Sequence, residues 1–93
     1  MSEERFTRLA LYPERHEAFL LGYPLYLTET EYAIVAFLSS LNGETASRGL
    51  ICELCGEESF NIHICNINKK ATELSGRKLI VFDGKNYKIN ENI

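Results

Sequence analysis

The residues best suited to metal or redox chemistry gather in the middle of the chain. Cys52-x-x-Cys55 followed by His63-x-Cys65 contains the ligand types of a Cys3His zinc site. On a helix, however, His63 and Cys65 lie two positions and so about 200° apart, and they do not easily face one metal ion. A redox pair at Cys52 and Cys55 is also disfavoured, because the carboxyl end of a helix raises the pKa of a thiol. We therefore expect neither a metal nor a cofactor, and we interpret the cysteines as small apolar residues.

Groups suited to catalysis are equally sparse. The only aspartate, Asp83, falls in a predicted turn; His16 falls in a polar loop, and His63 has no identifiable nucleophile to activate. The chain contains neither a glycine-rich phosphate loop nor a Gly-x-Ser-x-Gly elbow. We therefore expect no catalytic residues and no enzymatic activity.

The remaining chemistry is the binding of an anion. The 93 residues carry a net charge of −3, which by itself argues against nucleic acid. Residues 1–61, however, hold four basic and ten acidic side chains, net −6, whereas residues 62–89 hold six basic and two acidic ones, net +4. A basic third within an acidic chain fits an anionic partner that touches only that third. A lysine-rich surface that faces only solvent accounts for the same pattern.

Length and composition limit the class of protein. With 45% apolar and 25% charged residues the chain has an ordinary globular composition, and its length suits one core. No apolar run approaches the roughly 20 residues of a membrane span, and the acidic start is not a signal peptide. Three cysteines without a secretory signal favour reduced thiols. We therefore expect one cytoplasmic domain over residues 1–93, without membrane contact.

The elements that position these residues begin with strands. Apolar and polar residues alternate over residues 5–12, and short apolar runs follow at 18–21 and 23–27. Pro24 has no amide hydrogen to donate, so the third strand belongs at a sheet edge. Residues 5–27 therefore read as an antiparallel β-meander.

Three helices are predicted over residues 28–76. Thr28-Glu29-Thr30-Glu31 is a capping box and opens the first helix, which Asn42-Gly43 ends. Ser47 caps a short second helix that ends at Gly56, and Ser59 caps a third helix that ends at Ser75-Gly76. The helical period places the following residues on the buried faces: Ile34, Val35, Phe37, Leu38 and Leu41 in the first helix, Leu50, Ile51 and Leu54 in the second, and Phe60, Ile64, Ile67, Ala71 and Leu74 in the third.

The last element is a β-hairpin over residues 77–90. Residues 79–82 and 87–89 have the apolar character of strands, and Asp83-Gly84 forms the turn between them. The order of strands, three helices and hairpin defines an α+β protein.

The same order, with its motifs, resembles the OmpR/PhoB-type winged-helix effector domain of response regulators. The family's helix-opening pattern is matched by Leu27, Thr28, Glu31, Ile34 and Val35, and the start of its second helix by Ser47-Arg48. The pattern of its third helix is matched by Phe60, Ile62, His63, Ile64, Ile67 and Lys70, and that of its wing by Gly84, Tyr87 and Ile89. The resemblance covers nearly the whole chain and implies a winged helix-turn-helix with an N-terminal β-meander, three helices and a C-terminal hairpin wing.

The resemblance also implies a function: sequence-specific binding of double-stranded DNA by a transcription regulator of a two-component system. The third helix (59–75) would enter the major groove, and the wing (77–90) would reach the backbone or the minor groove. Tandem binding as a homodimer and contact with an RNA polymerase subunit are further implied partners. In such proteins the effector acts alone or beside a receiver domain, and both arrangements fit the sequence.

Two sets of residues are candidates for this interface. The base-facing candidates are Asn61, Ile62, Cys65, Asn66, Asn68 and Lys69, in which an asparagine amide suits adenine and Ile62 a thymine methyl group. The phosphate candidates are Arg48, Lys70, Arg77, Lys78, Lys85 and Lys88.

Three positions depart from the family pattern. Asn68 replaces an arginine of the third helix, Asp83 replaces a basic residue of the wing, and Asn86 replaces the wing's second glycine. The first two changes remove positive charge from the expected DNA-facing side. The alternative function is therefore a winged-helix protein-interaction module with reduced or no DNA affinity, which would use the acidic strand face and Ile62 as contact surfaces.

Overall fold

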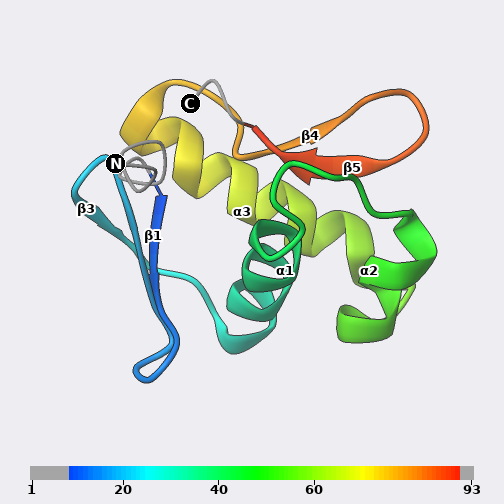
Figure 1. The fold of residues 1–93 in the computed structure, drawn as a ribbon, viewed down its shortest axis with the longest axis horizontal. Coiled ribbons are helices and arrows are strands. Elements are labelled where there is room, and N and C mark those ends of the chain that lie inside the picture. The colour runs from blue at the N-terminus through cyan, green and yellow to red at the C-terminus, as the bar shows by residue number, and fades with distance from the viewer. Residues whose placement is uncertain (1–8, 91–93) are drawn as a thin grey trace.

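The computed structural model of the chain describes residues 9–90 (Figure 1). It contains β1 (Leu9–Tyr12), β2 (Glu17–Leu20), β3 (Tyr23–Leu25), α1 (Glu29–Ser39), α2 (Arg48–Cys55), α3 (Phe60–Ser75), β4 (Ile80–Phe82) and β5 (Tyr87–Ile89). The predicted order of elements is confirmed. Strand β5 has its predicted bounds, β2 is shifted by one residue from 18–21, and β3 and β4 are shorter than their predicted ranges. Positions 5–8 of the predicted first strand lie outside the described residues.

The N-terminal sheet has the strand order β1-β2-β3, with both pairs antiparallel. Pro24 lies in β3 opposite Phe19, and β3 forms an edge of the sheet as predicted. Ala18, Leu20 and Leu25 are buried on the face that packs against the helices. The meander therefore covers one end of the core.

The capping box at the start of α1 forms as predicted. The Thr28 hydroxyl accepts a hydrogen bond from the Glu31 amide at 3.2 Å, and the Glu31 carboxylate accepts one from the Thr28 amide at 3.0 Å. Helix α1 ends at Ser39, and the chain then turns through positive φ at Asn42 and Gly43. Its predicted stripe faces the core, with Ile34, Val35 and Leu38 fully buried and Phe37 and Leu41 packed at the margin.

Helix α2 has the predicted bounds but a different buried face. The Ser47 hydroxyl caps the Leu50 amide at 3.3 Å, and Gly56 follows the last turn. Leu50 and Leu54 were predicted to be buried and are instead 49% and 42% exposed. Ile51 is buried, and Cys52 and Cys55, one and four positions after it, pack against the core beside it. The buried face of α2 therefore extends from Ile51 toward the cysteines, and the leucines on its other side face solvent.

Helix α3 crosses the molecule from α2 to the N-terminal sheet (Figure 1). Its predicted stripe is confirmed: Phe60, Ile67 and Ala71 are buried, and Ile64 and Leu74 pack against the core. Ser59 occupies the N-cap position, although its side chain makes no capping hydrogen bond. The stripe leaves the opposite side of α3 facing solvent.

The hairpin β4–β5 lies along α3, and its loop projects beyond the core at the end that carries α2 (Figure 1). Two backbone hydrogen bonds of 2.8 Å between Ala46 and Tyr87 join the base of the hairpin to the segment before α2. The architecture is the predicted α+β winged helix. Over residues 9–90, no helix combines the length and the apolar character needed to cross a membrane.

Candidate nucleic-acid interface

The solvent-facing side of α3 carries a polar surface. Five of the six predicted base-facing residues are exposed there: Asn61, Ile62, Cys65, Asn66 and Lys69. Because the opposite side of the helix is fixed in the core by Phe60 and Ile67, these five side chains are held outward.

An open groove of about 550 Å³ lies between α3 and the hairpin. Helix α3 supplies Asn61, Cys65 and Lys69 to its lining, and the hairpin side supplies Lys78 and Tyr87. Glu73 also lines it and is the acidic residue of the groove. One predicted phosphate contact, Lys78, and four predicted base contacts, Asn61, Cys65, Asn68 and Lys69, therefore line one depression, with a lysine on each side.

Asn68, in contrast, has its amide group committed within the protein. Its Nδ2 donates to the Ile80 carbonyl at 3.0 Å, and its Oδ1 accepts from the Ile80 amide at 2.8 Å. This two-point contact fastens α3 to the first strand of the hairpin. The sequence signal for it was its position one turn after Ile64, at the margin of the buried stripe.

Lys70 is also engaged inside the molecule. Its Nζ lies 2.6 Å from Oε1 of Glu31, a carboxylate that is only 2% exposed. The same oxygen accepts the Thr28 amide hydrogen bond of the capping box. Lys70 thus neutralises a buried charge at the start of α1, a role that sequence reasoning missed because the two residues are 39 positions apart.

The hairpin turn is built around the Asp83 carboxylate. Its Oδ1 accepts hydrogen bonds from the amides of Lys85 at 2.9 Å and Asn86 at 2.7 Å. These bonds to Asn86 and Lys85 hold the pKa of Asp83 below its ordinary value. The side chain of Asn86 donates to the Thr45 hydroxyl at 3.2 Å, so both departures in the hairpin take part in its local structure.

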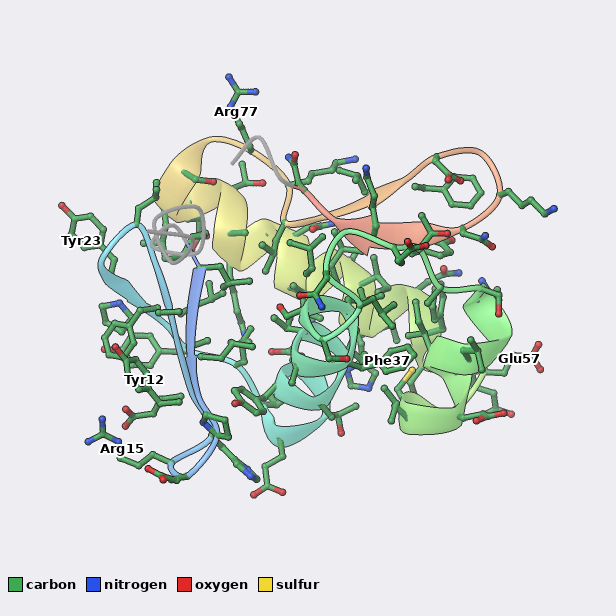
Figure 2. The ribbon with its side chains drawn as sticks, viewed as in Figure 1. Tyr12, Arg15, Tyr23, Phe37, Glu57 and Arg77 are labelled. Carbon is green, nitrogen blue, oxygen red and sulfur yellow. The ribbon has the colours of Figure 1, made fainter. Side chains whose placement is uncertain are left out.

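The remaining predicted phosphate contacts differ in their exposure and placement. Lys78, Lys85 and Arg48 are exposed and Lys88 is partly exposed. The Arg48 guanidinium lies 4.4 Å from the centre of the Phe60 ring, where it stacks at the start of α2. Arg77 points away from the body of the protein beyond the end of α3, far from the hairpin loop (Figure 2).

The cysteines and His63 do not come together as a metal site. Across residues 9–90, no three His, Cys, Asp or Glu side chains are grouped to hold an ion. Cys52 and Cys55 are partly buried on α2, and Cys65 is exposed on α3; all three are free thiols. Burial raises the pKa of the Cys55 thiol, and the neighbouring Cys52 raises it further, so Cys55 stays protonated at neutral pH.

Comparison with solved structures places this arrangement in a class. The class is the winged-helix domain with an N-terminal antiparallel sheet and a C-terminal hairpin, and the chain has the fold of the OmpR/PhoB-type DNA-binding domains, as its sequence resemblance predicts.

Two DNA-binding domains of response regulators are similar over most of the chain. The domain of CpxR from E. coli superimposes with a TM-score of 0.71 at 27% sequence identity, covering 88% of this chain and 89% of that one. The domain of AdeR, solved in complex with an intercistronic region, gives a TM-score of 0.73 at 22% identity, covering 89% and 94%.

A third similar structure comes from a family of redox sensors in the streptococci that evolved from two-component response regulators. Its TM-score is 0.72 at 22% identity, and the match covers 89% of this chain but 39% of that one. Models of known protein families give no match to the chain, and neither do curated protein sequences.

Proposed function

We propose that the chain is the sequence-specific DNA-binding domain of a transcriptional regulator. The observation that carries this proposal is the groove in which the exposed polar side of α3 faces the lysine-bearing hairpin. The two response-regulator domains described above support it, one of them solved with DNA.

In this proposal α3 lies in the major groove and presents Asn61, Asn66 and Ile62 to base edges. The amide of an exposed asparagine can pair with adenine through two hydrogen bonds, and Ile62 matches the methyl group of thymine. Asn68 is left out of this set because both polar atoms of its amide are bonded to Ile80.

The proposed phosphate contacts lie on α3, on the hairpin and its approach, and at the start of α2. Lys69 projects from α3, while Lys78, Lys85 and Lys88 belong to the hairpin and its approach, and Arg48 stands at the start of α2. Lys70 is left out because it neutralises Glu31. We further propose that copies bind in tandem and that an RNA polymerase subunit contacts the bound protein, as the resemblance implies.

The test is a titration of fluorescently labelled duplex DNA of random sequence, followed by anisotropy at 50 and 200 mM salt. About five phosphate contacts predict a roughly five-hundred-fold loss of affinity between the two salt concentrations. Lys69→Ala should weaken binding and reduce the salt slope by about one.

Arg15→Ala is the matched control, because Arg15 carries the same charge on the turn before β2, far from the groove (Figure 2). It should leave both affinity and salt slope unchanged. Absence of binding at the lower salt concentration would contradict the proposed function.

A protein-interaction module is the second candidate function. Helix α2 exposes Leu50 and Leu54, and on α3 the side chain of Ile62 is 61% exposed, so these apolar side chains are free to contact a protein partner. Failure to bind DNA at low salt, together with capture of one defined protein that Leu54→Glu abolishes, would favour this candidate.

A further inference from the structure

A chain of ring contacts runs from the core to the exposed part of the hairpin. Phe60, 1% exposed, packs edge-to-face against Tyr87 with ring centroids 5.2 Å apart. Tyr87 in turn contacts Phe82 at 4.7 Å, and Phe82 is 55% exposed. The exposed Phe82 ring thus packs against Tyr87, and Tyr87 is held in place by the buried ring of Phe60.

The hairpin register shows which way Phe82 faces. Phe82 pairs directly with Tyr87, so the two side chains share one face of the hairpin. Since Tyr87 lines the groove beside Asn61 and Lys69, Phe82 extends that lining outward along the hairpin. The exposed ring therefore lies on the side where we propose that DNA binds.

The backbone around Phe82 is firmly held. The next residue, Asp83, ties the turn together through the amides of Lys85 and Asn86, and Asn86 bonds to Thr45 outside the hairpin. A ring on such a support loses little freedom when it binds, which favours a contact role over a chance exposure.

The charge beside the ring fits the minor groove of DNA. Lys85 follows Phe82 in the turn, whereas Lys88 pairs with Val81 and so lies on the other face of the hairpin. A minor groove has apolar sugar walls with phosphates along both rims, so an apolar wedge beside a cation is complementary to it. Apolar side chains inserted there partly unstack a base step.

We propose that Phe82 is the group through which the hairpin contacts DNA, packing as a wedge into the minor groove while Lys85 contacts a flanking phosphate. The proposal rests on the proposed function and adds to it the residue and the kind of contact. It also explains how a hairpin with Asp83 in place of a basic residue binds DNA, because the contact is apolar at its centre.

The chain contains no tryptophan, so a single substitution supplies a specific probe. Phe82→Trp places an indole at the wedge, and Tyr23→Trp places one at a residue of similar exposure on the N-terminal sheet, at the opposite end of the molecule (Figure 2). Duplex DNA is added to each variant while tryptophan emission is recorded, and binding is measured in parallel by anisotropy of labelled DNA. Emission of Phe82→Trp should fall at least about two-fold on binding through stacking on bases, and that of Tyr23→Trp should stay constant.

Affinity gives a second measurement that does not depend on the indole. Phe82→Ala should weaken DNA binding by about ten-fold, and Phe82→Leu, which keeps an apolar wedge, should lose much less. Circular dichroism establishes that each variant is folded.

The outcomes separate the two proposals. Constant emission from Phe82→Trp on saturated DNA, or equal affinities of the alanine variant and the unmodified protein, would overturn the wedge and leave the proposed function standing. Absence of DNA binding by the unmodified protein would overturn both.

Discussion

Asn68 shows how one polar side chain can hold a binding surface in shape without touching the ligand. Its amide bonds to both backbone groups of Ile80, and Ile80 itself is buried. The family pattern has an arginine at this position. Here an uncharged amide replaces the guanidinium, and its two hydrogen bonds join α3 to β4. These bonds set the distance between the two walls of the groove.

Asn68→Ala should therefore lower stability more than a surface substitution does. The change leaves two partly buried backbone groups of Ile80 unpaired, which costs about 2 kcal/mol in free energy of unfolding. Urea denaturation measures this cost. Asn66→Ala, on the exposed side of the same helix, should leave stability within about 0.5 kcal/mol and weaken DNA binding instead. A normal unfolding curve for Asn68→Ala with reduced DNA affinity would instead assign Asn68 to the DNA contact.

At the scale of the element, the hairpin turn depends on the ionised form of Asp83. Its carboxylate accepts two backbone hydrogen bonds, from Lys85 and Asn86, and these keep its pKa below the ordinary value of 3.8. A group whose pKa is lowered by folding stabilises the folded form above its unfolded pKa. That contribution is lost as pH falls through the lower, folded value.

The amide resonances of Lys85 and Asn86, followed by NMR during acid titration, should therefore shift with a midpoint below pH 3.8. Asp83→Asn keeps an acceptor oxygen without the titrating group and should remove this transition. A midpoint at or above 3.8 in the unmodified protein would contradict the assigned role of the carboxylate.

The sequence predicts the elements well where local signals define them. The capping box of Thr28 and Glu31 and the caps at Ser47 and Gly56 fix helix ends through contacts within a few residues, and all of them form. The short helix α2 is different. Two turns contain too few residues for the helical period to tell Leu50 and Leu54 from Cys52 and Cys55 as the buried pair.

The candidate site is less predictable than the helices, because some of its side chains are positioned by the helical period and others by residues far away in the sequence. Exposure of Asn61, Asn66 and Lys69 follows from the periodicity of α3 alone. The partners of Asn68 and Lys70, in contrast, lie 12 and 39 positions away, and only tertiary packing brings them together. The position of Asn68 at the margin of the buried stripe hints that it faces inward, but no local pattern identifies the partner of either residue.

At the scale of the whole molecule, the pair of Glu31 and Lys70 joins the start of α1 to the middle of α3. Removing the cation alone leaves a carboxylate that is 2% exposed without its partner. Because Lys70 is itself about one-third exposed, Lys70→Met should cost roughly 2 kcal/mol of stability, less than a fully buried pair would.

A double-mutant cycle separates the interaction from its parts. Glu31→Gln retains an oxygen for the Thr28 amide, and the double variant Glu31→Gln/Lys70→Met should be more stable than the sum of the single losses predicts. Urea denaturation of the four proteins gives the coupling free energy. Strictly additive losses would show that the 2.6 Å contact contributes nothing to stability.

The double hydrogen bond between Ala46 and Tyr87 has a consequence for the DNA rather than for the protein. Together with the Asn68 contact to Ile80, it prevents the hairpin from moving away from α3 as a rigid unit. In a complex of the proposed kind the two walls keep their spacing, so the duplex must supply the deformation. Duplexes with easily bent pyrimidine–purine steps beneath the hairpin would then be preferred over stiff ones, even at base pairs that no side chain contacts.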